Sequence, residues 1–149
     1  MAHTHLEHKA MVNPKAGVFP LYVKVDFAQH PLAAATDYHV LAKLLKNWII
    51  LDSFWKLPTA TASAATMDIG TIYDGSGQDI VAGADISGAY TLWQQGAKLP
   101  GTIQITDADS YLTCEAVGAA VGDGTLEILL LIATGVDESE PADRVAVTS

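Results

Sequence analysis

The sequence predicts an all-β protein, either an antiparallel β-sandwich or a jelly-roll-like barrel, with an extended N-terminal arm. Three observations lead to this fold class. Seven or eight segments have the composition of short strands, turn-forming Gly, Pro and Asp separate them about every dozen residues, and few convincing helices lie between them. The last point argues against a doubly wound α/β fold, which needs helices between its strands. With 149 residues, the chain is long enough for one domain with a substantial core.

The first predicted strand begins at Pro20 and has the clearest pattern. Its apolar side chains alternate with polar ones, at Leu21, Val23, Val25 and Phe27. This period of two is typical of a half-buried strand. The next segment, residues 38–46, fits a helical turn as well as another strand, and its sequence does not decide between them.

Residues 48–57 are rich in β-branched and aromatic side chains and predict a long strand that Pro58 ends. Trp48 and Trp55 lie seven residues apart on this strand, so they face opposite sides and at least one belongs to the core. An exposed Trp, including Trp93, would be a candidate interface anchor. Later strands are predicted at residues 67–73, 89–94, 102–106, 111–117 and 125–133.

The chain divides into three parts by composition. Residues 1–18 are polar, carry His and Lys, and lack sustained periodicity, so we expect an extended arm. Residues 19–135 hold the predicted strands and form the sandwich domain. Residues 136–149 are acidic, and we expect a tail that is either mobile or ordered by a partner.

The charge balance excludes some classes of partner. Eight Lys and Arg against 17 Asp and Glu give a net charge of −9, without the basic clusters that neutralise phosphates, so we expect no nucleic-acid partner. No apolar run approaches membrane-spanning length, and the N-terminus lacks the apolar core of a secretion signal. We therefore expect no membrane partner and a protein that folds in a cytoplasm.

The histidines are the residues best suited to bind a metal ion, yet their arrangement in the sequence does not predict a metal site. His3, His5 and His8 lie in the arm, where no Cys or second cluster completes a rigid set of ligands. His30 and His39 lie near acidic residues in sequence, but no nucleophile motif accompanies them, so we interpret them as surface histidines. We expect neither a metal nor another cofactor.

A search for catalytic groups also fails, and we expect that the protein is not an enzyme. No serine lies in a G-x-S-x-G turn. Cys114, the single cysteine, is predicted to be a small buried hydrophobe on a strand. Residues 74–79 are predicted to form a glycine-rich turn rather than a calcium loop, and Asp107 and Asp109 a turn rather than a glycosidase pair.

Three segments carry a resemblance to a known class of proteins. Residues 67–85 contain an Asp-Ile-Gly strand, an Asp-rich loop and Val-Ala-Gly-Ala-Asp; residues 102–110 and the Ile- and Leu-rich residues 125–132 follow. The series resembles small virion structural proteins of tailed bacteriophages. The resemblance implies a capsid decoration, or cement, protein: a β-sandwich or jelly-roll-like trimer on the outer capsid surface, assembled in the host cytoplasm, with the major capsid protein as partner.

An extended arm can add as a strand to a neighbouring sheet, and weak contacts repeated over a symmetric shell add up by avidity. We therefore expect the arm to bind the partner and the protein to stabilise contacts between neighbouring capsid subunits. The predicted partner-binding residues are His5, Leu6, His8, Lys9, Met11, Val12 and Lys15. The alternative is a receptor- or glycan-binding module of a head fibre or tail, in which loops present Tyr and Trp to sugar.

Overall fold

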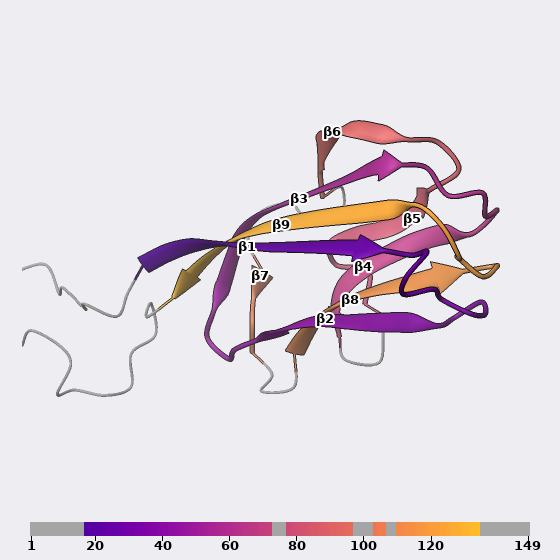
Figure 1. The fold of residues 1–149 in the computed structure, drawn as a ribbon. Coiled ribbons are helices and arrows are strands. Elements are labelled where there is room, and N and C mark those ends of the chain that lie inside the picture. The colour runs from indigo at the N-terminus through magenta and orange to yellow at the C-terminus, as the bar shows by residue number, and fades with distance from the viewer. Residues whose placement is uncertain (1–16, 73–76, 97–102, 107–109, 135–149) are drawn as a thin grey trace, which may run out of the picture.

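The computed structural model describes residues 17–72, 77–96, 103–106 and 110–134 (Figure 1). Among these residues there are nine strands and no helix, so the predicted all-β class is confirmed. The strands are β1 (Gly17–Asp26), β2 (Tyr38–Leu44), β3 (Ile49–Thr59), β4 (Thr66–Ile72), β5 (Val81–Asp85), β6 (Tyr90–Gln95), β7 (Ile103–Gln104), β8 (Ser110–Val117) and β9 (Thr125–Thr134).

The strands form two antiparallel sheets that pack face to face. One sheet has the order β1-β9-β3-β6, with the short β7 also paired to β3, and the other has the order β2-β8-β4-β5. Across the molecule the pairs are nested: β1 with β9, β2 with β8, β3 with β6 and β7, and β4 with β5. This nested pairing, with β4 and β5 as the innermost pair and the pairs divided between two sheets, is the topology of a jelly roll.

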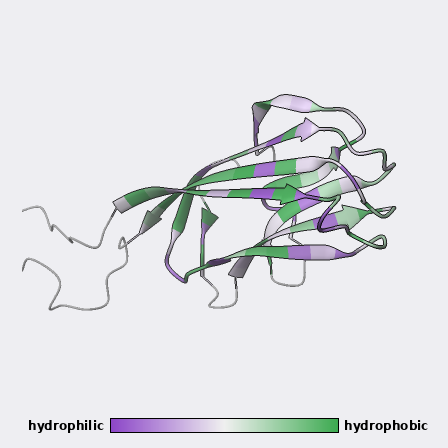
Figure 2. Cartoon of the chain, in the orientation of Figure 1, coloured by the Kyte–Doolittle hydropathy of each residue, from purple (hydrophilic) through white to green (hydrophobic). Residues whose placement is uncertain are grey.

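The core lies between the sheets and follows the period of two. In β9 the inward residues Leu126, Ile128, Leu130 and Ile132 are all buried, while the residues between them are half-buried. Figure 2 shows hydrophobic and hydrophilic residues alternating along β1, whereas β9 is hydrophobic along most of its length and only the burial of its residues alternates. The pattern explains why the register of β1 against β9 is continuous over ten residue pairs, since a slip of one residue would turn the apolar side chains to the solvent.

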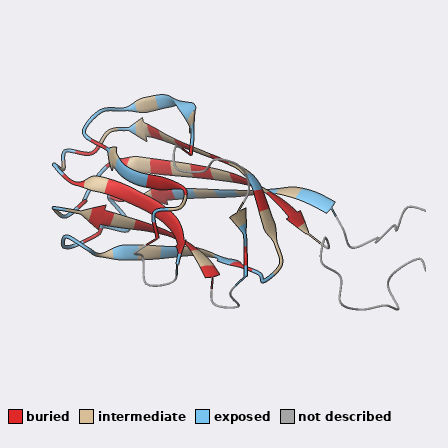
Figure 3. Ribbon diagram, turned by 180° about the vertical axis from the view of Figure 1, so that it is seen from behind, coloured by how far each residue is buried: buried red, intermediate tan, exposed pale blue. Residues whose placement is uncertain are grey.

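The β4 strand is buried along most of its length, as Figure 3 shows from behind. Its outer face is covered by the segment that follows residue 76. There Gly77 approaches Gly70 so closely that a Cβ on Gly70 would lie 2.3 Å from the Gly77 carbonyl carbon. Asp68 on the same face accepts hydrogen bonds from the Gln78 side chain (2.7 Å) and the Gly83 amide (2.6 Å). These bonds satisfy a carboxylate that is almost fully buried.

Two segments are clearer in the structure than in the sequence. The ambiguous residues 38–46 contain a strand, β2, not a helical turn. Its register shifts between Val40 and Ala42, and this bulge at Leu41 is what breaks the alternation. The short β5 was not among the predicted strands, because Gly83 in its interior has a positive φ of 66° and its composition is that of a loop.

The predicted long strand exists as β3, with two irregularities. Its register shifts between Ile50 and Asp52, so the side chains that face inward change parity there. A second shift surrounds Pro58, which lacks the amide proton of a ladder donor, and the strand still continues to Thr59. Trp55 is 7% exposed and packs against Tyr90 with ring centroids 5.0 Å apart, which confirms that at least one of the two tryptophans belongs to the core.

Candidate interaction surfaces

The seven predicted partner-binding residues of the arm lie outside the described residues. The structure does show where the arm joins the domain. Gly17, the first residue of β1, is paired with Thr134, the last residue of β9, so the N- and C-terminal segments leave the sandwich at the same end (Figure 1). Gly17 and Val18, which composition assigned to the arm, are part of β1.

The outer face of the β1-β9-β3-β6 sheet carries a group of four side chains, Tyr22, Glu127, Lys56 and Trp93, which we call the aromatic cluster. They come from four neighbouring strands, one from each. The Lys56 ammonium lies 3.6 Å from the Glu127 carboxylate and 4.7 Å from the centroid of the Trp93 ring. The Tyr22 and Trp93 rings meet edge to face, with centroids 6.5 Å apart. The two rings therefore flank an ion pair whose charges already compensate each other.

The electrostatics of the cluster follow from one hydrogen bond. The Tyr22 hydroxyl donates to Glu127 Oε1, and this bond, together with slight desolvation and the negative charge of Glu127, raises the pKa of Tyr22 above its ordinary value. The phenol therefore keeps its proton to a higher pH than an ordinary tyrosine, and its hydroxyl remains a donor to Glu127. Tyr22 is 51% exposed and Trp93 38% exposed, so both rings remain open to a partner.

Apolar side chains extend this surface along the sheet. Leu129 and Phe54 lie in the cross-strand row of Tyr22 and are half-buried. Val18 near the start of β1, which has the same orientation as Tyr22 on that strand, is 64% exposed. An exposed apolar patch with aromatic residues and no unpaired charge at its centre is typical of an interaction surface. The sequence did not predict the cluster, because Tyr22 and Glu127 are 105 residues apart; its one signal was Trp93, named as a possible anchor.

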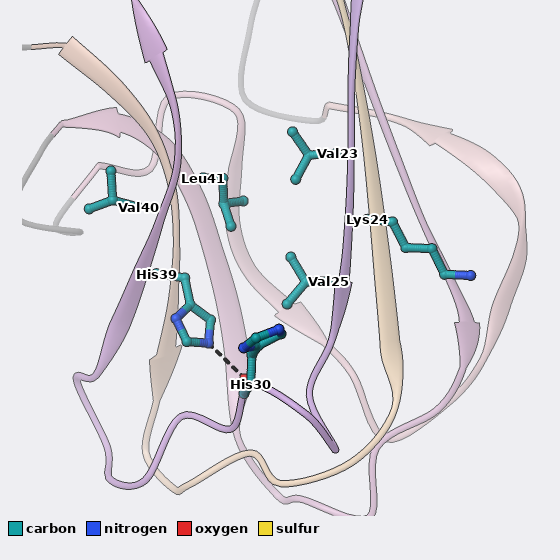
Figure 4. Close-up of a pocket in the computed structure, with 7 residues that line it drawn as sticks. All are labelled: Val23, Lys24, Val25, His30, His39, Val40 and Leu41. Atoms are coloured by element: carbon teal, nitrogen blue, oxygen red, sulfur yellow. Dashed lines mark hydrogen bonds between the residues drawn. The ribbon is translucent and has the colours of Figure 1, made fainter.

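A second surface feature is a shallow groove of about 300 Å³ between β1 and β2. Val23, Val25 and Leu41 point into it, whereas Lys24 points away (Figure 4). His39 Nε2 lies 2.7 Å from the carbonyl oxygen of His30, and the His39 ring stacks on the buried Phe27 with centroids 6.3 Å apart. His30 is exposed and His39 is half-buried. The contacts that hold His39 are those of a structural side chain at the rim of the groove.

Two reactive side chains in the described residues, Cys114 and Asp79, are buried or hydrogen-bonded. Cys114 is fully buried, and burial raises the pKa of its thiol to about 12, so it is a poor nucleophile, as expected for a core residue. Asp79 accepts hydrogen bonds from the amide and the hydroxyl of Thr71. Among the described residues, no three His, Cys, Asp or Glu side chains come close enough to hold a metal ion. Asp107 and Asp109 lie outside those residues.

In the part of the chain that the structure describes, no helix has both the length and the apolar composition needed to cross a bilayer.

Comparison with protein-family models and with curated proteins finds no match. The fold is nevertheless similar to chains in two solved phage capsids. One comes from the capsid asymmetric unit of the cyanophage Pam1, with 15% identity, a TM-score of 0.54, and coverage of 79% of this chain and 85% of that chain. The other comes from the acidic stable capsid of the Helicobacter pylori bacteriophage KHP30, with 9% identity, a TM-score of 0.58, and coverage of 83% and 90%. At these identities the likeness shows the fold alone.

Proposed function

We propose that this protein is a structural subunit of a phage capsid and, more narrowly, a decoration protein that stabilises contacts between neighbouring major capsid subunits on the outer surface. The observation that carries the proposal is the likeness, over most of both chains, to two chains from phage capsids. The aligned part covers 85% and 90% of those chains, so each is similar in length to this one. The likeness is therefore to whole small subunits rather than to one domain of a large shell protein.

The aromatic cluster supports the proposal from the physical side. A decoration protein must bury apolar surface against a shell without leaving a charge unpaired at the contact, since an unpaired buried charge is costly. Tyr22 and Trp93 offer exposed rings, and the Lys56 and Glu127 charges beneath them are already paired. We propose that this face contacts the major capsid protein. A homotrimer would place three such faces around one axis of the shell.

The N-terminal arm supplies the second part of the proposal. Residues 1–16 include the seven proposed partner-binding side chains, and they join the domain at Gly17, which pairs with Thr134 at the end of β9. An arm of this kind adds main-chain hydrogen bonds to a neighbouring sheet, and many copies on one particle multiply weak contacts by avidity. The acidic composition of residues 136–149 favours a partner surface that is basic.

The test is binding to capsids that lack this protein, followed by cryo-electron microscopy of the particles. We expect added density on the outer surface where capsid subunits meet, and loss of binding when residues 1–18 are deleted. Trp93→Ala should weaken binding by roughly tenfold or more, the usual effect at an interface anchor, while Thr91→Ala on the same strand serves as the matched control. Bare particles beside a folded protein would refute the decoration role, and full binding of the truncated protein would refute the role of the arm.

A second candidate function is glycan binding, as in a receptor-binding module of a head fibre or tail. The observation that favours it is again the pair of exposed rings, Tyr22 and Trp93, which meet edge to face on an open sheet. A glycan array probed with the intact protein and with Trp93→Ala discriminates between the candidates. A signal that Trp93→Ala abolishes, together with bare capsids, would favour glycan binding over decoration.

A further inference from the structure

The side of the sandwich that β1 and β2 border is open. Among the described strands, β1 and β2 are each the last strand of their sheet and have a partner on one side only. Between them lies the groove of about 300 Å³, whose floor is apolar. An edge strand with free backbone groups beside an apolar groove is a binding site for an added strand, because the backbone supplies hydrogen bonds and the groove receives alternate side chains.

The position of Pro20 shows which backbone groups of β1 are free. A proline is tolerated in an edge strand where its nitrogen faces away from the neighbouring strand. Residues two apart share this orientation, so the N–H and C=O groups of Val18, Tyr22 and Lys24 also face away from β9. The hydrogen bonds at the end of β1 agree with this orientation. The carbonyl of Asp26, two residues after Lys24, accepts from the turn that follows, whereas the Phe27 amide donates to the Gly124 carbonyl before β9.

We propose that residues 5–12 of the chain form a strand antiparallel to β1 of the same molecule, with Leu6 opposite Val25, and so fill the groove and close this edge. This strand would form in the free protein, whether or not the protein binds a capsid. Three properties of the N-terminal segment favour it as the strand that fills the groove: its attachment point, its side-chain pattern and its charges.

The attachment point favours the chain's own edge. The segment joins β1 at Gly17, and Asn13-Pro14 has the residues preferred at the first two positions of a type I turn. A turn there returns the chain along β1. Eight residues in a strand span roughly 26 Å, the same length as residues 19–26 opposite them. A short covalent connection of this kind also gives a local concentration in the millimolar range.

The side-chain pattern then sets the register. With Leu6 opposite Val25, the residues of one face of the segment lie opposite the inward, partly or fully buried residues of β1. The pairs are Leu6–Val25, His8–Val23, Ala10–Leu21 and Val12–Phe19. A shift by one residue would instead place charged Glu7 and Lys9 on the inner face.

Charge supports the same register. In this register Glu7 falls opposite Lys24, so two residues of opposite charge face each other. Opposite charges directly across an antiparallel pair are favourable, and like charges are not. On the outer face Lys9 falls opposite the Tyr22 ring. The added strand would itself become the edge of the sheet and would present its remaining backbone groups to a partner.

Disulfide trapping tests the register in the full-length protein. In the proposed register, Ala10 and Leu21 form a pair without mutual hydrogen bonds, with Cα atoms about 4.5 Å apart, a distance at which a disulfide can form. The double variant Ala10→Cys/Leu21→Cys should cross-link within one chain under mild oxidation. The control Ala10→Cys/Val23→Cys, one diagonal step away, should cross-link far less. Cys114 is buried and common to both variants.

Three other results would overturn the proposal. They are no cross-link in the first variant, equal cross-linking in both, and an interchain product when single-cysteine variants Ala10→Cys and Leu21→Cys are mixed. The last result would place the segment on the edge of another copy.

Hydrogen exchange gives an independent readout without new cysteines. The amides of Tyr22 and Lys24 should be protected in the full chain and lose that protection when residues 1–16 are removed. The amides of Leu21 and Val23, which face β9, should stay protected and so report that the truncated domain is folded. Unprotected Tyr22 and Lys24 amides in the full chain would overturn the proposal.

Discussion

The hydrogen bond between Tyr22 and Glu127 links β1 to β9 and raises the pKa of Tyr22. Because the phenol donates to the carboxylate, the pKa of Tyr22 is raised above its ordinary value. We expect Glu127→Gln to bring the pKa of Tyr22 back toward that value, as measured by NMR titration of labelled tyrosine. The contribution of the bond to stability should be fully present below the ordinary tyrosine pKa and be lost as the pH rises through the raised pKa.

The matched control for this titration is Glu115→Gln, on the other sheet. This variant should leave the pKa of Tyr22 unchanged. A pKa of Tyr22 that does not respond to Glu127→Gln would mean that the charge of Glu127 does not act on the phenol in solution.

Gly70 is the residue at which a single methyl group should matter most. A Cβ there would lie 2.3 Å from the Gly77 carbonyl carbon, and backbone atoms cannot yield as a flexible side chain can. We expect Gly70→Ala to lower the free energy of unfolding by about 2 kcal/mol or more, measured by chemical denaturation. Gly88→Ala, where nothing lies within 4 Å, should change it by less than about 0.5 kcal/mol.

At the scale of the element, β9 is the strand on which the core depends. It pairs with both β1 and β3, and Leu130 near its centre is fully buried. We expect Leu130→Ala to lower the free energy of unfolding by about 2–5 kcal/mol, because it leaves a cavity between the sheets. Leu92→Ala, which removes the same atoms from an exposed position on β6, should cost less than about 0.5 kcal/mol in denaturant titrations. Equal losses would contradict the assignment of β9 to the core.

Sequence patterns found those elements whose pattern no bulge interrupts. In β1 apolar and polar residues alternate, β9 contains a continuous run of apolar residues of strand length, and both strands were predicted. Where a bulge shifts the register, as at Leu41 in β2, residues on either side no longer alternate, and a helical turn fitted the sequence equally well. The bulge after Ile50 likewise changes which face of β3 is buried. Bulges are set by the partner strand, which the local sequence does not contain.

The aromatic cluster was hidden from the sequence for a related reason. Its four residues come from four strands, and the strand order that joins them is a property of the whole fold. Lys56 and Glu127 face each other because β3 and β9 pair in one particular register. The sequence indicated only that an exposed tryptophan, such as Trp93, could anchor an interface. The arm residues, which lie outside the described residues, remain a prediction.

At the scale of the molecule, both sheets share one core. Buried side chains from β4 and β8 of one sheet and from β3 and β9 of the other belong to a single hydrophobic cluster. We therefore expect one cooperative unfolding transition, in which tryptophan fluorescence, reporting on the β3 and β6 side, coincides with far-ultraviolet circular dichroism, reporting on all strands. Separate midpoints from the two signals would mean that one sheet can melt without the other.

The nested pairing also has a consequence for how the protein is made. Within the part of the chain that the structure describes, the first strand, β1, pairs with the last, β9, and Asp26 lies opposite Thr125. About 100 residues must be synthesised between these partners, which takes roughly 5–20 s at typical rates of translation. During that interval β1 has emerged from the ribosome with its apolar face uncovered. The newborn chain is thus most exposed to aggregation and to chaperones before the last ten residues of the fold appear, and its yield should depend on how fast those residues follow.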